Sequence, residues 1–130
     1  MNWLLDVSVL VAFGLAEHEF HQRVATWVAS EGSASFSSCP ITELGFIRVV
    51  SQPQAHGLAL DQARRILVRL KSAVGFRFIP DDLDISQLPA WVKTPPQSTD
   101  GYLVQLARAH GATLATLDRK IPGAFVIPLI

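Results

Sequence analysis

The chain has 130 residues, of which 49% are hydrophobic, and its 11 basic and 11 acidic residues give a formal net charge of zero. This length suits one domain over residues 1–130 with a sizeable core, and the neutral balance gives no bulk sign of a nucleic-acid partner. No apolar run is long enough to cross a bilayer, no secretory signal is evident and the single Cys39 excludes an internal disulfide, so we expect a cytoplasmic protein away from membranes.

The first half of the chain alternates short apolar segments with amphipathic ones. Residues 3–5 predict a buried strand that passes into a helix after Ser8, and residues 17–30 repeat apolar side chains at helical spacing. A second short strand is predicted over residues 34–39. Pro40 follows it in the position favoured at a helix N-terminus, so we expect the next helix to begin there.

The second half continues this alternation and adds one long connection. Its expected elements are a helix over residues 58–74, a strand over 76–80, a helix over 100–110, a strand over 112–117 and a final strand over 124–130. Pro128 favours an edge position for the final strand. Residues 81–99, which are polar and rich in proline, are expected to be either functional or partly structured, because connections of this length are uncommon in small domains.

Strands that alternate with helices predict an α/β domain with a parallel sheet covered on both faces. In such sheets the ligand site lies at the carboxyl ends of the strands. The segments predicted to reach that edge carry four acidic residues: Asp6, Glu43, Asp100 and Asp118. We therefore expect their carboxylates to lie on the same rim of the sheet.

Each acid also has an ordinary structural explanation. Asp6 can cap the helix that follows it. The charge of Asp100 is favourable near a helix N-terminus, and Asp118 can begin a turn. Glu43 is harder to explain in this way, because it shares a stripe with apolar residues and Arg48 points to a different side of the helix. Four converging carboxylates are, however, the oxygen-rich ligand set that Mg²⁺ or Mn²⁺ requires, so the sequence predicts a carboxylate-only metal site.

The residues around these acids resemble a known family. The matching segments are Asp6-Val7-Ser8, residues 42–49 (TELGFIRV), residues 99–103 (TDGYL) and residues 116–118 (TLD). As a set, in this order and spacing, they are similar to the PIN domain in its branch of VapC-type ribonuclease toxins of type II toxin–antitoxin systems. The resemblance implies a PIN-like three-layer α/β/α fold around a central, mostly parallel sheet of about five strands.

The resemblance also assigns roles to particular residues. It implies that Asp6, Glu43, Asp100 and Asp118 are the family's four catalytic and metal-binding acids. The hydroxyls that accompany them, and that would orient water or a carboxylate, are Ser8, Thr99 and Thr116. For Ser8 and Thr99 helix capping is the simpler reading, and both roles can hold together. Arg48 matches an arginine of the toxin branch that either contacts RNA phosphate or bridges to a surface acid.

By the same resemblance the protein is a Mg²⁺-dependent endoribonuclease, with Mn²⁺ as a substitute ion, that hydrolyses RNA to products with a 5′-phosphate and a 3′-hydroxyl. The implied partners are the RNA substrate, a cognate VapB-type antitoxin that blocks the metal site, and a second copy of the chain in a homodimer. The alternative is a catalytically silent PIN-like module that binds RNA or a partner. The intact set of four acids disfavours this alternative.

The remaining residues that could bear function carry weaker signals. His18, His21, His56 and His110 lack a metal-ligand motif and are interpreted as structural or surface residues. Trp3, Trp27 and Trp91 are predicted to lie in the core rather than to stack on bases, although Trp91 falls in the long connection. The basic residues on the helix over residues 58–74 are interpreted as a solvated face, with contact to an RNA backbone as the alternative. Gly101 stands out because glycine is a weaker helix former than alanine.

Overall fold

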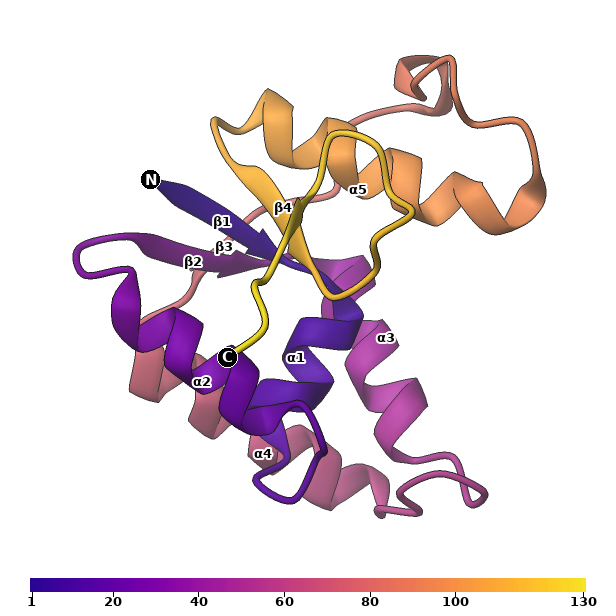
Figure 1. The fold of residues 1–130 in the computed structure, drawn as a ribbon. Helices are drawn as coiled ribbons and strands as arrows, with labels where there is room; N and C mark the ends of the chain where they lie inside the picture. The colour runs from indigo at the N-terminus through magenta and orange to yellow at the C-terminus, as the bar shows by residue number, and fades with distance from the viewer.

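A computed structural model describes residues 1–130, and a five-stranded, all-parallel sheet lies at its centre (Figure 1). The strands are β1 (Asn2–Leu5), β2 (Ser35–Ser38), β3 (Arg77–Phe78), β4 (Thr113–Thr116) and β5 (Phe125–Val126), in the spatial order β3-β2-β1-β4-β5. The predicted α/β class and strand number are thereby confirmed. The final strand lies at an edge, as Pro128 predicted.

Five helices cover the sheet on its two faces. They are α1 (Val7–Gly14), α2 (His21–Ser30), α3 (Pro40–Val50), α4 (Leu60–Val74) and α5 (Ser98–Ala109). Figure 1 shows α5 on one face and the other four helices on the opposite face. The long connection contains two short 3₁₀ turns, Ile85–Gln87 and Pro95–Gln97, so the expectation of partial structure is confirmed. No helix is long and apolar enough to span a membrane.

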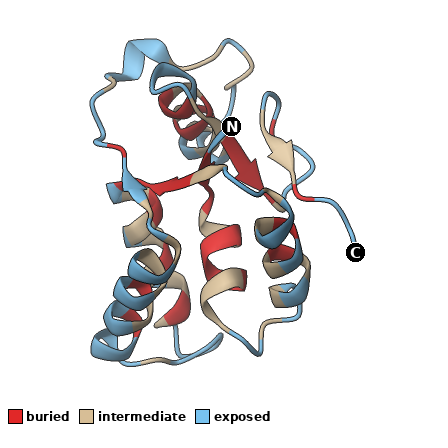
Figure 2. Cartoon of the chain, turned by 90° about the vertical axis from the view of Figure 1, so that its left-hand side faces the viewer, coloured by how far each residue is buried: buried red, intermediate tan, exposed pale blue.

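Alternation along β1 divides the core between the two faces. Trp3 and Leu5 pack with α1 to α4, whereas Leu4 packs with Leu103 and its neighbours on α5. This follows from the strand period of two, which sends successive side chains to opposite faces. Each fully buried leucine contributes about 1.5–3 kcal/mol relative to exposure. Figure 2 shows the buried residues gathered on the sheet and on the helix faces turned toward it.

Trp3 and Trp27 confirm their predicted core positions, whereas Trp91 in the long connection is only partly buried. Trp3 and Trp27 are each 4% exposed, and their ring centroids lie 5.3 Å apart in an edge-to-face arrangement. This geometry places the positive edge of one ring against the negative face of the other, which stabilises aromatic pairs. The contact fastens α2 to the first strand of the sheet.

Helix capping differs from the prediction for Ser8 and Thr99. Helix α1 is capped by Asp6, so Ser8 lies one residue inside the helix. Helix α5 begins at Ser98, and Thr99 therefore lies within its first turn. The capping interpretation is wrong for Ser8 because Asp6 occupies the cap position, and it is wrong for Thr99 because the 3₁₀ turn at Pro95–Gln97 runs directly into α5.

Two glycines allow close packing beside the acidic residues. A Cβ atom at Gly101 would lie 2.3 Å from Cγ2 of Val92, and a Cβ atom at Gly45 would lie 2.5 Å from Cγ2 of Val7. Both distances are far below van der Waals contact, and valine is stiff because it branches at Cβ. Gly101 is therefore present because the long connection packs against the first turn of α5.

Replacing Gly101 with alanine is expected to destabilise the protein although alanine is the better helix former. The gain in helix propensity is at most about 1 kcal/mol, whereas forcing an extra methyl group into packed structure costs about 1–3 kcal/mol. Urea denaturation of Gly101→Ala should show the loss, and the Val92→Ala background should relieve it. Equal losses in both backgrounds would mean that the contact with Val92 is not the cause.

Candidate active site

The sheet brings Asp6 next to the end of β4. Strands β1 and β4 are parallel neighbours with Leu5 opposite Ala115, and the amide of Asp6 donates to the carbonyl oxygen of Ala115 over 3.0 Å. Asp6 directly follows β1, while Thr116 is the last residue of β4. Because the strands are parallel, both residues reach the carboxyl edge of the sheet.

The carboxylate of Asp6 is nearly enclosed and is held at both oxygens. The residue is 8% exposed. Its Oδ1 accepts from the Val7 amide over 2.8 Å, and its Oδ2 accepts from Oγ1 of Thr116 over 2.7 Å. Burial raises the pKa of Asp6 above its ordinary value, the two hydrogen bonds oppose that shift, and the charge of Asp118 adds to it. The raised pKa means that the charged form of Asp6 has lost part of its hydration in the folded protein.

Thr116 joins two of the acidic positions through one hydroxyl group. Its Oγ1 donates to Asp6 and accepts from the amide of Asp118 over 3.1 Å. The residue is fully buried, so neither bond is exchanged readily for water. Ser8 supports the same loop, since its Oγ accepts from the amide of Leu117 at 3.4 Å. Thr99 is exposed and makes no such bond.

Asp100 faces the same group from the first turn of α5. It is half-buried, and its carboxylate accepts no hydrogen bond. Burial raises the pKa of Asp100, and the charges of Asp6 and Asp118 raise it further. Asp118 is exposed, and its Oδ1 accepts from the amide of Lys120, as expected of a turn residue. The structure thus brings three of the four predicted acids into electrostatic contact.

Glu43 is held separately by a cation from another helix. Its Oε2 lies 2.6 Å from Nζ of Lys71 on α4 and accepts from Oγ of Ser38, also over 2.6 Å. Ser38 is the last residue of β2, so Glu43 belongs to the same sheet edge. Its charge is not among those that shift the pKa of Asp6 or Asp100. The sequence did not single out Lys71 for this role, because the contact joins residues 28 positions apart on different helices.

The donor set suits a hard divalent cation in its chemistry. The three aspartates offer only oxygen atoms, repel one another, and include one carboxylate without a hydrogen-bond partner. No group of three His, Cys, Asp or Glu side chains is arranged as a formed ligand cluster. Asp6, Asp100 and Asp118 therefore repel one another without forming a complete ligand set, and the Glu43 carboxylate pairs with Lys71 instead.

Arg48 lies exposed in the last turn of α3 and forms no ion pair. The alternative in which Arg48 bridges to a surface acid is therefore not seen. Its guanidinium is free to meet an anion from solution.

The acidic group predicts how the metal-free stability depends on pH. The raised pKa values of Asp6 and Asp100 mean that the folded state binds their protons more tightly than the unfolded state. The stability that protonation of these two carboxyl groups adds to the fold is fully present below the ordinary carboxyl pKa. It is lost as the pH rises through the raised pKa values. With EDTA present, the urea midpoint should therefore rise as the pH falls through the raised pKa values toward the ordinary carboxyl pKa, and less steeply in Asp100→Asn. An identical slope in the variant would contradict this assignment.

Comparison with known proteins agrees with this architecture. The PIN domain family model matches residues 3–124. Ribonuclease VapC38 of Mycobacterium tuberculosis is 37% identical over 122 residues, which cover 91% of this chain and 86% of the relative. Ribonuclease VapC44 of the same species is 35% identical over 138 residues, covering 95% and 94%. A solved structure of VapBC2 from Rickettsia felis, bound to a DNA fragment from their promoter, matches 96% of each chain with a TM-score of 0.62 and 16% identity.

Proposed function

The chain belongs to the PIN domain family, in its VapC branch, and from this premise we propose that it is a Mg²⁺-dependent endoribonuclease toxin. The observation that supports this most directly is the group of Asp6, Asp100 and Asp118, whose charges act on one another at the carboxyl edge of the sheet. The relatives in this branch are named ribonucleases. The substrate class is accordingly RNA, hydrolysed at its phosphodiester bonds.

Asp6, Asp100 and Asp118 would hold the divalent ion, with Mn²⁺ as a substitute for Mg²⁺. Once bound, such an ion polarises a phosphoryl oxygen and lowers the pKa of water, so that hydroxide is available at neutral pH. Asp6 is suited to the central position because both of its oxygens are already oriented by the Val7 amide and by Thr116. Asp100 has no competing hydrogen-bond partner to lose.

Glu43 serves as a further ligand or orients the attacking water. Ser38 and Lys71 fix one oxygen of its carboxylate, and the second oxygen makes no hydrogen bond. Ser8 and Thr116 support the loop that carries Asp118, since their hydroxyls accept from the amides of Leu117 and Asp118. Thr99, beside Asp100, is exposed toward solvent and would orient water rather than a carboxylate.

Arg48 is proposed to contact the RNA backbone. Its charge is uncompensated within the protein, and a planar guanidinium binds phosphate through two parallel hydrogen bonds. It lies on α3, the helix that also carries Glu43. A phosphate next to the cleaved bond is the expected partner.

The test of this function is cleavage of several structured RNAs by the purified protein with Mg²⁺, with Mn²⁺ and with EDTA. New ends should carry a 5′-phosphate and a 3′-hydroxyl, because activated water rather than the ribose 2′-hydroxyl attacks. EDTA should abolish the cuts. Cleavage that persists in EDTA and leaves cyclic phosphates would overturn the metal mechanism. Absence of cleavage from every RNA would favour the silent binding module.

The proposed partners are a VapB-type antitoxin and a second copy of the chain, in the cytoplasm where RNA is available. The fold match to a VapBC complex supports this choice of antitoxin class. Co-expression with the cognate antitoxin should give a complex that survives purification and cleaves RNA poorly. Light scattering of the free protein should give twice the chain mass of 14.2 kDa. A monomer whose cleavage ignores the antitoxin would contradict both partner assignments.

A further inference from the structure

A groove leads from the acidic edge along helix α1. At one end it is lined by Ser8 and Asp118, and at the other by His18, Phe20 and His56. Val7 and Val11, one helical turn apart on α1, also line it. The groove has a volume of about 490 Å³ and is open to solvent. It is continuous with the proposed cleavage site because Asp118 lines it.

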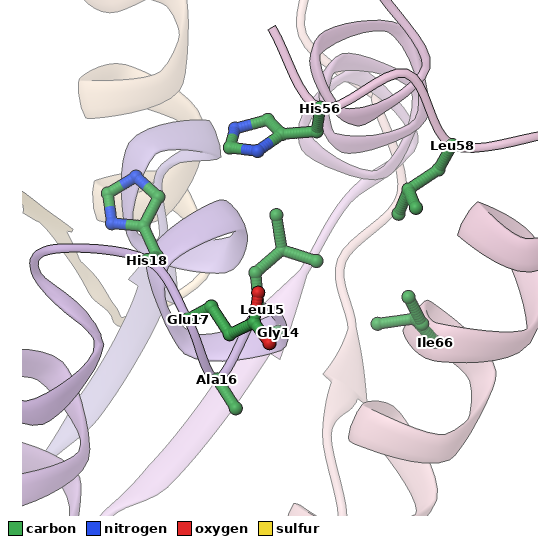
Figure 3. A pocket seen from close by; sticks show the side chains of 8 residues that line it. All are labelled: Gly14, Leu15, Ala16, Glu17, His18, His56, Leu58 and Ile66. Atoms are coloured by element: carbon green, nitrogen blue, oxygen red, sulfur yellow. The ribbon is translucent and has the colours of Figure 1, made fainter.

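His18 and His56 also line a second cavity, of about 460 Å³, together with residues 14–17 of α1 and the α1–α2 loop (Figure 3). Figure 3 shows the two rings beside each other above Leu15, one from the α1–α2 loop and one from the α3–α4 loop. Their ring centroids are 6.1 Å apart with an angle of 35° between the planes. The pair therefore stands where two cavities meet, and ring surface of both histidines is accessible.

These two histidines differ from the other two in having no evident structural role. Nδ1 of His21 is bonded to the carbonyl oxygen of Ala12, and His110 pairs with Asp82 over 2.8 Å. His56 is exposed and has no hydrogen bond. His18 accepts a single local bond at Nδ1, from the amide of Phe20 over 3.0 Å. The positions of His18 and His56 are thus not explained by the stability of the fold.

Aromatic and cationic surface continues around the pair. Phe20 is 38% exposed, whereas Trp3 and Trp27 are buried. Its ring centroid lies 5.8 Å from that of His18, and the guanidinium of Arg23 lies 5.8 Å from its centre. Exposed planar rings with a nearby guanidinium are the surface on which single-stranded bases stack.

The polar groups here suit a base rather than a phosphate. Burial lowers the pKa of His18 below its ordinary value, and the neighbouring His56 lowers it further while Glu19 opposes the shift, so the neutral ring is favoured at neutral pH. With Nδ1 accepting from Phe20, the neutral ring carries its proton on Nε2 and offers one donor. Glu19 lines the groove and Glu17 lines the adjoining cavity, and both would repel phosphate. A carboxylate can instead accept from the amino group of a base.

We propose that His18, Phe20 and His56 form a nucleobase-binding subsite for single-stranded RNA, at the end of the groove opposite Asp118. This inference rests on the proposed function, because it takes the acidic end as the point of cleavage. The base that occupies the subsite belongs to a nucleotide near the cut bond, because Asp118 lines the same groove. The subsite thereby contributes to the choice of cleavage position.

The experiment is a double-mutant cycle in which histidine side chains of the protein and single bases of the RNA are removed, separately and together, and the binding affinity is compared. A panel of labelled single-stranded RNAs of about twelve nucleotides, with an abasic site at each position in turn, is titrated by fluorescence anisotropy in EDTA. Losing one base should weaken binding to the wild type about tenfold. The His18→Ala/His56→Ala variant should bind the intact RNA about tenfold more weakly and lose nothing further at that abasic position. His110→Ala, which changes a histidine elsewhere, should behave as the wild type.

Several results would overturn the subsite. The first is that the abasic site weakens binding equally in the wild type and in the double variant. The second is that the double variant binds the intact RNA as tightly as the wild type does. The third is that the wild type binds none of the RNAs. A change in oligomeric mass with independent losses would identify the surface as a protein interface instead. Cleavage in Mg²⁺ is measured separately. If the double variant loses the preference for the base but the wild type does not cleave RNA, only the catalytic proposal is wrong. If the wild type cleaves RNA but the abasic site and the double variant act independently on binding, only the subsite is wrong. Thermal unfolding of each variant checks that the fold is retained.

Discussion

The Asp6→Asn variant is expected to fold normally and to lose RNA cleavage by about a thousandfold or more. Asparagine keeps the shape of the side chain but removes the charge that a divalent ion needs. Asp6 is the acid whose position is fixed most firmly, because it is 8% exposed and both of its oxygens are oriented by hydrogen bonds.

The same variant should be more stable than the wild type in EDTA. Burial raises the pKa of Asp6, so its charged form is disfavoured in the folded protein, and the charge of Asp118 adds repulsion. Asparagine is as good a helix N-cap as aspartate, so α1 keeps its first turn. Urea denaturation at pH 7 in EDTA should show a higher midpoint for Asp6→Asn, and Mg²⁺ should stabilise the wild type more than the variant.

The matched control is Asp84→Asn. Asp84 is exposed, caps the 3₁₀ turn at Ile85–Gln87 and has no part in the acidic group. Its substitution should leave cleavage unchanged. If Asp6→Asn cleaves at the rate of the wild type, or if both variants lose cleavage equally, the assignment of the site is wrong.

The second large effect is expected from Thr116→Val. Valine has nearly the shape of threonine, so the change removes one hydroxyl that donates to Asp6 and accepts from the Asp118 amide. Metal affinity should fall by about 10–100-fold, which is the usual loss when a group that orients a metal ligand is removed. Because the Thr116 bond lowers the pKa of Asp6, its loss should also let that pKa rise further.

Isothermal titration with Mn²⁺ measures the affinity directly, and the Mg²⁺ dependence of cleavage measures it independently. Thr116→Ser is the control, because serine keeps the hydroxyl and should retain most of the affinity. Thr116 is fully buried, so thermal unfolding must accompany both measurements. Equal affinities for the valine variant and the wild type would show that Thr116 only stabilises the fold.

The elements that sequence predicts well here are those encoded by local pattern. The apolar run after Met1 forms β1, Pro40 begins α3, and the alternation of strands and helices leads to a parallel sheet. Helix starts were predicted less well. Thr99 resembles a cap in sequence, but the 3₁₀ turn before it continues into α5, and that continuity depends on how residues 81–97 pack against the domain.

The candidate site divides in the same way. The motifs predict the set Asp6, Glu43, Asp100 and Asp118, and the pairing of β1 with β4 accounts for the approach of Asp6 to the Asp118 loop. The pairing of Glu43 with Lys71 could not be predicted, because it depends on the angle at which α3 and α4 pack. The groove to His18 and His56 is likewise formed by two loops that meet only in the folded chain.

The hydrogen bond from Thr116 to Asp6 spans 110 positions in sequence. The central strand β1 has β4 as a neighbour in the sheet, and Thr113, the first residue of β4, follows Leu5 only after the whole of α1 to α5 has been synthesised. At about 5–20 residues per second, synthesis holds the two halves of the acidic group apart for several seconds. During this interval the bonds of Thr116 to Asp6 and Asp118 cannot form, so the acidic group can assemble only after β4 has joined the sheet.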